Sequence, residues 1–233
     1  MAELPYGVYW EMARELVTLD RIGMCVGLPI EAGPWASYSY AHAADVARLD
    51  ILAADGGLYA DIDTLFLRPI PDALWAAPAV IGREADVKYG DAPLPEPSMS
   101  NALLMAAPGS DFVVEWRRRI FAAMDGTWSG HSCRLATRLA VANPDWVHVE
   151  PQSTFHPFDH NPAGIAAMLE EPLVPGSLDR TVSMHLCAHL WWEEHRRDFS
   201  RLCAFDITEA RLASDETALA YAARPYLPVT ALW

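Results

Sequence analysis

The segment that decides the fold is residues 41–63, which read AHAADVARLDILAADGGLYADID. Its first half predicts a helix with one apolar face, because apolar side chains recur there at helical spacing. These side chains are Val46, Leu49, Leu52 and Ala53. The Gly56-Gly57 pair that follows predicts a tight turn, since glycine readily adopts the backbone conformations in which helices end. The segment therefore predicts a helix, a turn and then a strand.

Two acidic residues, Asp61 and Asp63, stand one residue apart just after this turn. In a β-strand the side chains of residues i and i+2 point to the same face, so a strand here would present both carboxylates to one ion. Carboxylate oxygens are preferred ligands of hard divalent cations. The spacing therefore predicts a metal site.

Asp45 and Arg48 lie three residues apart in the predicted helix, which makes them neighbours on its surface. A solvated ion pair is the usual role of such residues. Here, however, the pair precedes the glycine turn, the Asp-x-Asp element and the apolar residues 65–67 in one contiguous unit. A charged strand end is costly beside a buried sheet, so we interpret the unit as a functional site.

This ordered string resembles the sugar-nucleotide-binding signature of the DXD-containing glycosyltransferases of family 32. That group includes mannosyltransferases, capsular-polysaccharide transferases and, more distantly, the glucosylating clostridial toxins. The matching pattern is A-x-x-x-D-x-x-R, then L-x-x-x-G-G-x-Y-x-D-x-D and a closing R-P. The resemblance implies a GT-A-like, Rossmann-like α/β fold, with a mixed, mainly parallel central sheet flanked by helices and ligands at the carboxyl ends of its strands.

The resemblance also implies a reaction, namely retaining transfer of a hexosyl group from a nucleotide diphosphate sugar to an acceptor hydroxyl. A UDP-sugar is the favoured donor, and the acceptor would be a glycan, a lipid-linked molecule or a small molecule. Asp61 and Asp63 would hold Mn²⁺ or Mg²⁺, while Asp45 and Arg48 would orient the sugar as catalytic residues. The remaining nucleotide-sugar contacts in this part of the chain would come from Gly57, Tyr59 and Asp61.

Two later elements extend the resemblance. Asn101 matches an Asn that relatives carry near the acceptor side of the donor sugar, although a backbone-bonding Asn is the commoner role. His185 and Trp191 fall on family positions that supply a late metal ligand and an indole over the nucleotide. His189 stands where relatives have Gly or Ser, and would either contact the β-phosphate or be an ordinary histidine.

The start of the chain departs from the family. Residues 5–11 resemble the segment that relatives carry after their first βαβ unit, so the fold is expected to lack that unit. The resemblance covers residues 6–192, and the tail over 206–233 matches nothing familiar. With 233 residues, 52% of them hydrophobic, we expect a single domain over residues 1–233.

Composition excludes two classes of partner. The formal net charge is −14, whereas nucleic acids and anionic membrane surfaces are bound mainly through Lys and Arg. No stretch approaches the roughly 20 apolar residues that span a bilayer, and no signal peptide is recognised. The four cysteines form no CxxC pair, so a reduced, cytoplasmic setting is expected. They are Cys25, Cys133, Cys187 and Cys203.

Residues 84–98 are polar and rich in proline, so we expect a long loop that is either disordered or a lid that closes over the acceptor. A short buried strand is expected over 100–106, followed by a helix that begins near Ser110 or Asp111.

Two other functions stay open. A metal-dependent hydrolase or phosphotransferase would use the same Asp pair but would need further acids spaced as metal bridges, and only apolar residues and Arg68 follow Asp63 closely. A degenerate, non-catalytic member that binds a sugar or a partner is the second alternative, which the absent first unit makes credible.

Overall fold

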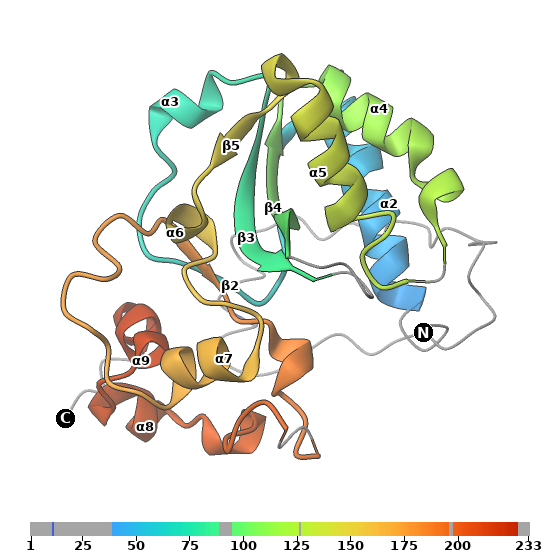
Figure 1. Cartoon of the computed structure of the whole chain (residues 1–233). Coiled ribbons are helices and arrows are strands. Elements are labelled where there is room, and N and C mark those ends of the chain that lie inside the picture. Colours follow the sequence, from blue (N-terminus) through green and yellow to red (C-terminus); the bar gives the residue numbers. More distant parts are fainter. Residues whose placement is uncertain (1–10, 12–38, 89–94, 126, 196–197, 228–233) are drawn as a thin grey trace.

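The structure, a computed structural model, describes residues 11, 39–88, 95–125, 127–195 and 198–227 (Figure 1). Its strands are β1 (Gly57–Ala60), β2 (Thr64–Phe66), β3 (Ala79–Val87), β4 (Glu96–Ala106), β5 (His148–Glu150) and β6 (Ser183–His185). Its α-helices are α2 (Ser39–Ala54), α3 (Asp72–Trp75), α4 (Asp111–Arg119), α5 (Cys133–Ala142), α6 (Gln152–Phe155), α7 (Pro162–Leu169), α8 (Glu209–Ser214) and α9 (Ala218–Ala223).

The central sheet has the strand order β1-β4-β3-β5 and is mixed. β4 pairs antiparallel with both β1 and β3, whereas β5 pairs parallel with β3. The expected α/β class with a mixed sheet is therefore confirmed, but parallel pairing does not predominate among the described strands. The reason is local, because only residues 88–95 join β3 to β4, and a parallel crossover needs a dozen or more.

Alternating side chains give this sheet two apolar faces. Ile81 of β3 lies opposite Leu104 of β4 on one face, and Val80 lies opposite Met105 on the other. The first face packs against α2, α4 and α5, which lie together on one side of the sheet in Figure 1. The second packs against α3 and α6. The sheet thus forms the middle layer of the fold.

The expected helix, turn and strand are all present in the segment that opens the fold. The apolar face of α2 is buried, and the chain leaves it with φ values of +68° at Gly56 and +102° at Gly57. A Cβ atom at Gly56 would lie only 2.6 Å from Cδ of Pro108, so glycine is required there on both counts. The turn thereby fixes where β1 and the acidic element begin.

The predicted long loop over 84–98 is wrong in its boundaries. Glu84 and Ser98 are opposite each other in the β3–β4 pairing, and Ser98 Oγ donates a hydrogen bond to Glu84 (2.6 Å). The polar residues at both ends of this segment belong to strands, where their side chains bond across the β3–β4 pair. The strand expected over 100–106 is correspondingly longer, because β4 begins at Glu96. Residues 89–94, 5–10 and Cys25 lie outside the described residues.

The later part of the chain builds a second, smaller layer. β2 and β6 form an antiparallel pair, and α7 and α9 pack around a core that contains Met184, Trp191 and Leu219. The tail after residue 206 therefore contributes helices to this core. No helix in the described part of the chain combines the length and apolar character needed to cross a bilayer.

Candidate active site

The Asp-x-Asp element lies in a turn, not in a strand as expected. β1 ends at Ala60, and the Thr64 N–H donates to the Asp61 carbonyl oxygen (3.1 Å) around the fully exposed Ile62. The chain must bend here because β2 leaves the central sheet to pair with β6. The bend nevertheless keeps the carboxylates of Asp61 and Asp63 at one site.

Asp61, Asp63 and His185 form a group whose potential ligand atoms all lie within 4.8 Å of one another. His185 Nε2 is 3.2 Å from Asp63 Oδ1 and 4.0 Å from Asp61 Oδ2. Pairing of β2 with β6, which sets Thr64 opposite His185, brings the histidine to the acids across 122 residues of sequence. Two carboxylates and an imidazole on partly exposed side chains fit a divalent cation such as Mn²⁺.

Neighbouring groups hold this set in place. Burial alone would raise the pKa of Asp63, but hydrogen bonds from His185 and from the Ala188 N–H (2.8 Å) lower it to about 2, so this carboxylate is ionised at neutral pH. Burial would lower the pKa of His185, yet Cys187 and Asp63 raise it well above its usual value. A cation at Nε2 would therefore displace a proton from His185.

Asp45 anchors a second, buried cluster. Its Oδ1 accepts a hydrogen bond from Asn101 Nδ2 (2.6 Å) and lies 3.1 Å from an Arg48 guanidinium nitrogen. Its Oδ2 lies 3.0 Å from His131 Nε2, which carries the proton of this bond because a carboxylate paired with Arg accepts. Asp45 is 8% exposed and Arg48 4%, so the solvated ion pair is excluded.

Arg48 joins the two clusters. The same guanidinium nitrogen lies 3.4 Å from Asp61 Oδ1, and its central carbon is 4.3 Å from the centre of the Tyr59 ring. The Tyr59 hydroxyl donates to Asp61 (2.6 Å), and burial raises its pKa so that it remains a donor. Arg48 also donates to the backbone oxygen of Asn101. The sequence-predicted residues of α2, β1 and β4 are thus one connected network.

Both clusters line a cavity of about 760 Å³, a size typical of small-ligand sites. His189 also lines it, with its ring stacked on Trp128 at 5.5 Å between centroids. Gly57 does not, because it begins β1 opposite Ala106, at the far end of the strand from the acidic turn. Its predicted contact with the nucleotide sugar is therefore not supported, and the turn geometry explains this glycine instead.

Trp191 is the second predicted residue that does not line the cavity. Its side chain is 1% exposed within the smaller core, and its indole N–H already donates to the Leu186 carbonyl oxygen (2.7 Å). The resemblance places this indole over the nucleotide, whereas in this structure it lies in the smaller core.

The cavity also contains residues that sequence reasoning did not identify. His42 precedes Asp45 by one helical turn, and this spacing could have indicated that both face the same site. Trp128 and His160 are contributed by distant loops without a recognisable motif. His131, on another distant loop, does not line the cavity but is fully buried against Asp45. His42 and His131 pack edge to face at 4.7 Å between centroids. Burial and the neighbouring His131 lower the pKa of His42.

His156 is a packing residue behind this site. It is 5% exposed and its ring lies 6.2 Å from that of His185. Burial, with the nearby His185 and His160, lowers the pKa of His156 to about 3. Its ring is therefore neutral at physiological pH and forms a wall behind the candidate metal ligands.

The candidate cation site and the buried Asp–Arg pair lie on a mixed α/β fold of the GT-A-like class. Two comparisons agree with this class. Residues 29–84 match the family described as "Glycosyltransferase sugar-binding region containing DXD motif". A curated protein of Cryptococcus neoformans var. grubii serotype A, "Glucan organizing enzyme 1", is 30% identical over 155 residues. Over the matched residues the chain is similar to DXD-containing glycosyltransferases.

The aligned region covers 65% of this chain and 40% of that relative, so the chain spans well under half of the relative's length. The family match includes the acidic turn and both residues of the Asp45–Arg48 pair.

Proposed function

We propose that this protein is a metal-dependent, retaining glycosyltransferase that moves a hexosyl group from a nucleotide diphosphate sugar, with a UDP-sugar favoured, to an acceptor hydroxyl. The observation that carries the proposal is the grouping of Asp61, Asp63 and His185 at a cavity shared with Asp45 and Arg48. Each cluster alone is common in proteins. Together they supply a place for a diphosphate and a place for a sugar.

The partly exposed cluster of Asp61, Asp63 and His185 supports binding of the diphosphate. A divalent cation bound there would neutralise the negative charge that grows on the leaving diphosphate as the anomeric C–O bond breaks. Asp61, Asp63 and His185 would hold this ion. Mn²⁺ and Mg²⁺ both suit carboxylate ligands, and the imidazole favours Mn²⁺ of the two. His189 lies in the same cavity, where it can donate to a phosphate oxygen.

The buried cluster supports binding of the sugar. The carboxylate of Asp45 is held by three neighbours, so its position does not depend on the ligand. Its second oxygen retains a lone pair that can accept from a sugar hydroxyl, and Arg48 can donate to the sugar ring or its hydroxyls. Fixed groups of this kind orient the anomeric carbon toward the acceptor.

Retention of configuration requires either a covalent intermediate or attack on the same face that the diphosphate leaves. We propose the second, in which the leaving phosphate oxygen takes the proton of the acceptor hydroxyl. Within the described residues, Asp45 supports this choice because its bonds to Asn101, Arg48 and His131 restrain it from approaching as a nucleophile.

We propose a sugar hydroxyl as the acceptor. The curated relative is named for organizing a glucan, and a cavity bounded by amides, carboxylates and aromatic rings is suited to a polyhydroxyl molecule. We also propose a reducing, cytoplasmic setting, which the free thiols of the described Cys133, Cys187 and Cys203 support.

The proposal is tested by thermal unfolding and donor hydrolysis with Mn²⁺ and a panel of nucleotide sugars. A ligand that binds only the native state raises Tm according to its concentration and affinity. We expect one donor to raise Tm only when Mn²⁺ is present, and the Asp61→Asn/Asp63→Asn double variant to lose this shift together with hydrolysis. A shift without hydrolysis or transfer would identify the non-catalytic alternative, and the absence of any shift would contradict the proposal.

A further inference from the structure

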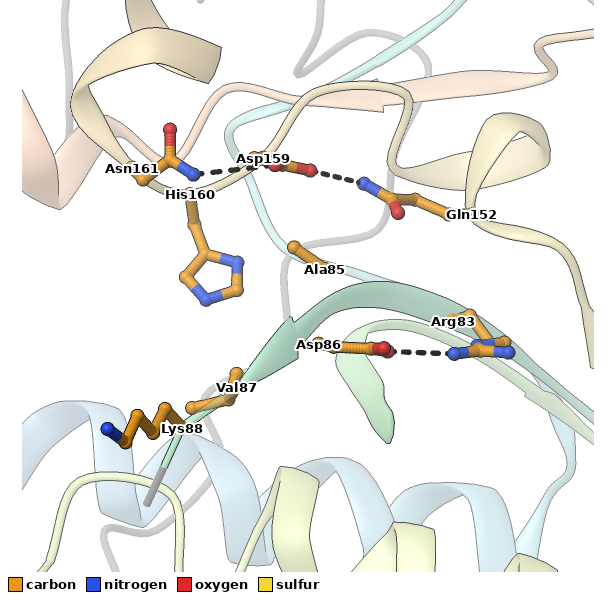
Figure 2. A pocket seen from close by; sticks show the side chains of 9 residues that line it. All are labelled: Arg83, Ala85, Asp86, Val87, Lys88, Gln152, Asp159, His160 and Asn161. Atoms are coloured by element: carbon orange, nitrogen blue, oxygen red, sulfur yellow. Dashed lines mark hydrogen bonds and ion pairs between the residues drawn. The ribbon is translucent and has the colours of Figure 1, made fainter. Parts of the chain in front are cut away.

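A second cavity, of about 560 Å³, opens beside the candidate active site (Figure 2). Its lower wall is the end of β3, with Arg83, Ala85 and Asp86, and its upper wall is the segment before α7. We call this cavity the side groove. It has no role in the proposed chemistry, since neither the metal ligands nor the Asp45–Arg48 pair line it.

The side groove adjoins the active-site cavity. Val87 and His160 line both cavities. Figure 2 shows the His160 ring projecting from the segment before α7 toward the end of β3, at Val87. A molecule that reaches the active site past His160 and Val87 therefore has the side groove as its continuation.

The charges in the side groove compensate each other. Arg83 pairs with Asp86 (2.8 Å), and the Asp159 carboxylate accepts from the side-chain amides of Gln152 (2.8 Å) and Asn161 (3.4 Å). Lys88, also on its wall, balances the second carboxylate. An anionic ligand such as a nucleotide would find no net positive charge here, which argues against an extension of the donor site.

The same groups are suited to sugar hydroxyls. Amides, carboxylates and a guanidinium offer donors and acceptors side by side, and each still has valences left after the bonds described. The small side chain of Ala85 leaves the floor between them open. Hydrogen-bonding groups around an open groove with no net charge fit a neutral polyhydroxyl chain better than they fit an apolar or charged one.

We propose that the side groove is an acceptor subsite, which binds the inner sugar units of a neutral oligosaccharide whose terminal hydroxyl enters the active site past His160. This inference rests on the proposed glycosyl transfer and adds the class of acceptor, a sugar chain longer than a monosaccharide. Selectivity for chain length then resides in residues 83–88 and 152–161.

The test fills the groove without touching the active site. Ala85→Phe places a ring on the groove floor, and Ala85 does not line the active-site cavity. The matched control is Ala77→Phe, which puts the same ring into a separate hollow of about 520 Å³. Binding of glucose and of α- and β-linked glucan oligosaccharides of increasing length is measured by calorimetry, alongside the Mn²⁺-dependent Tm shift with nucleotide sugars.

For the unchanged protein we expect affinity to rise about tenfold from glucose to the longer oligosaccharides, which corresponds to about 1.4 kcal/mol, roughly one well-placed hydrogen bond. Ala85→Phe should remove this gain while Ala77→Phe retains it, and both should keep the donor-dependent Tm shift. Gln152→Leu, which adds no bulk, should reduce the gain in part.

Three outcomes would overturn the inference: no length dependence in the unchanged protein, a length dependence that Ala85→Phe leaves intact, or loss of donor binding in Ala85→Phe. These outcomes are separable from failure of the proposed function, because that failure would appear as absence of the donor-dependent Tm shift in the unchanged protein.

Discussion

Two carboxylate clusters line one cavity, and they differ in how far the hydrogen-bonding capacity of their carboxylates is used by neighbouring side chains. Around Asp45 the side chains of Arg48, Asn101 and His131 form a closed shell, and the carboxylate side chain is 10% exposed. Around Asp61 and Asp63 the side chains are 27% and 21% exposed, and the ligand atoms point toward a common space. The first cluster is fully bonded within the protein, whereas the second leaves the donor set of a candidate cation site partly exposed.

Because of this difference, mutations in the two clusters should have different effects on stability and on ligand binding. A buried charge whose partner is removed is strongly destabilising, while an exposed carboxylate can be rehydrated. We therefore expect variants of the Asp45 cluster to unfold more easily and variants of the acidic turn to lose ligand binding with little loss of stability. Four predictions test this contrast.

The largest effect is expected for Asp45→Ala, which leaves Arg48 buried with only the more distant Asp61 as a counter-ion. Removing one partner of a buried pair typically costs about 3–5 kcal/mol of unfolding free energy. Asp50→Ala is the matched control, because Asp50 lies on the same helix and pairs with Arg117 on the surface, where the cost should be below about 1 kcal/mol. Urea unfolding measures both, and equal losses would contradict the contrast.

His131→Phe is expected to cost about 1.5–3 kcal/mol, the range for a hydrogen bond to a charged group. The ring volume is retained, so the change removes mainly the Nε2–H donor to Asp45. His131→Gln, which can restore a donor, should recover part of the loss. Donor-sugar affinity should follow the same order if His131 positions Asp45, and an unchanged affinity in both variants would limit His131 to a structural role.

A smaller loss of stability is expected at acidic pH, because His156 is buried behind the cluster of Asp61, Asp63 and His185. The pKa of His156 is about 3 in the folded protein, below the ordinary value of 6.5. Between these values the unfolded chain binds the proton more readily, so stability is full above pH 6.5 and falls as the pH decreases. At pH 5.5 the expected loss is about 1.4 kcal/mol relative to pH 7.5.

His156→Phe is the control for this pH effect, because it keeps an aromatic ring and cannot be protonated. The difference in unfolding free energy between pH 7.5 and 5.5 should shrink by about 1.4 kcal/mol in the variant. His185 and His160, which face His156, remain in both proteins and their contributions therefore cancel in the comparison. An identical pH dependence in the two proteins would show that His156 is not held neutral by burial.

The contrast between the clusters also explains what the sequence could predict. Helix α2, the turn at Gly56 and Gly57, and β1 follow from local patterns, since apolar spacing and glycine conformation act within a few residues. The spacing of Asp61 and Asp63 predicts a metal site, and the resemblance adds His185 as a third candidate ligand. The hydrogen bond from His131 to Asp45 could not be predicted, because the two residues are 86 positions apart and no motif accompanies His131.

The errors have the same origin. Gly57 and Trp191 occupy family positions, but their places here are decided by a left-handed turn and by packing in the smaller core. The Asp-x-Asp spacing predicts one strand face, whereas the switch of β2 to a second sheet converts it into a turn. In each case a long-range contact outweighs the local pattern.

The smallest effect on stability is expected for Asp61→Asn. The amide oxygen of Asn can still accept from the Tyr59 hydroxyl and face Arg48, and the side chain is partly hydrated, so the unfolding free energy without metal should change by less than about 1 kcal/mol. The amide is a far weaker cation ligand than a carboxylate, so the Tm shift caused by Mn²⁺ and donor should fall sharply. Unfolding with and without Mn²⁺ measures both quantities on one sample. A stability loss as large as that of Asp45→Ala would mean that the acidic turn is also needed for folding. The proposed contrast between a stabilising cluster and a ligand-binding cluster would then be wrong.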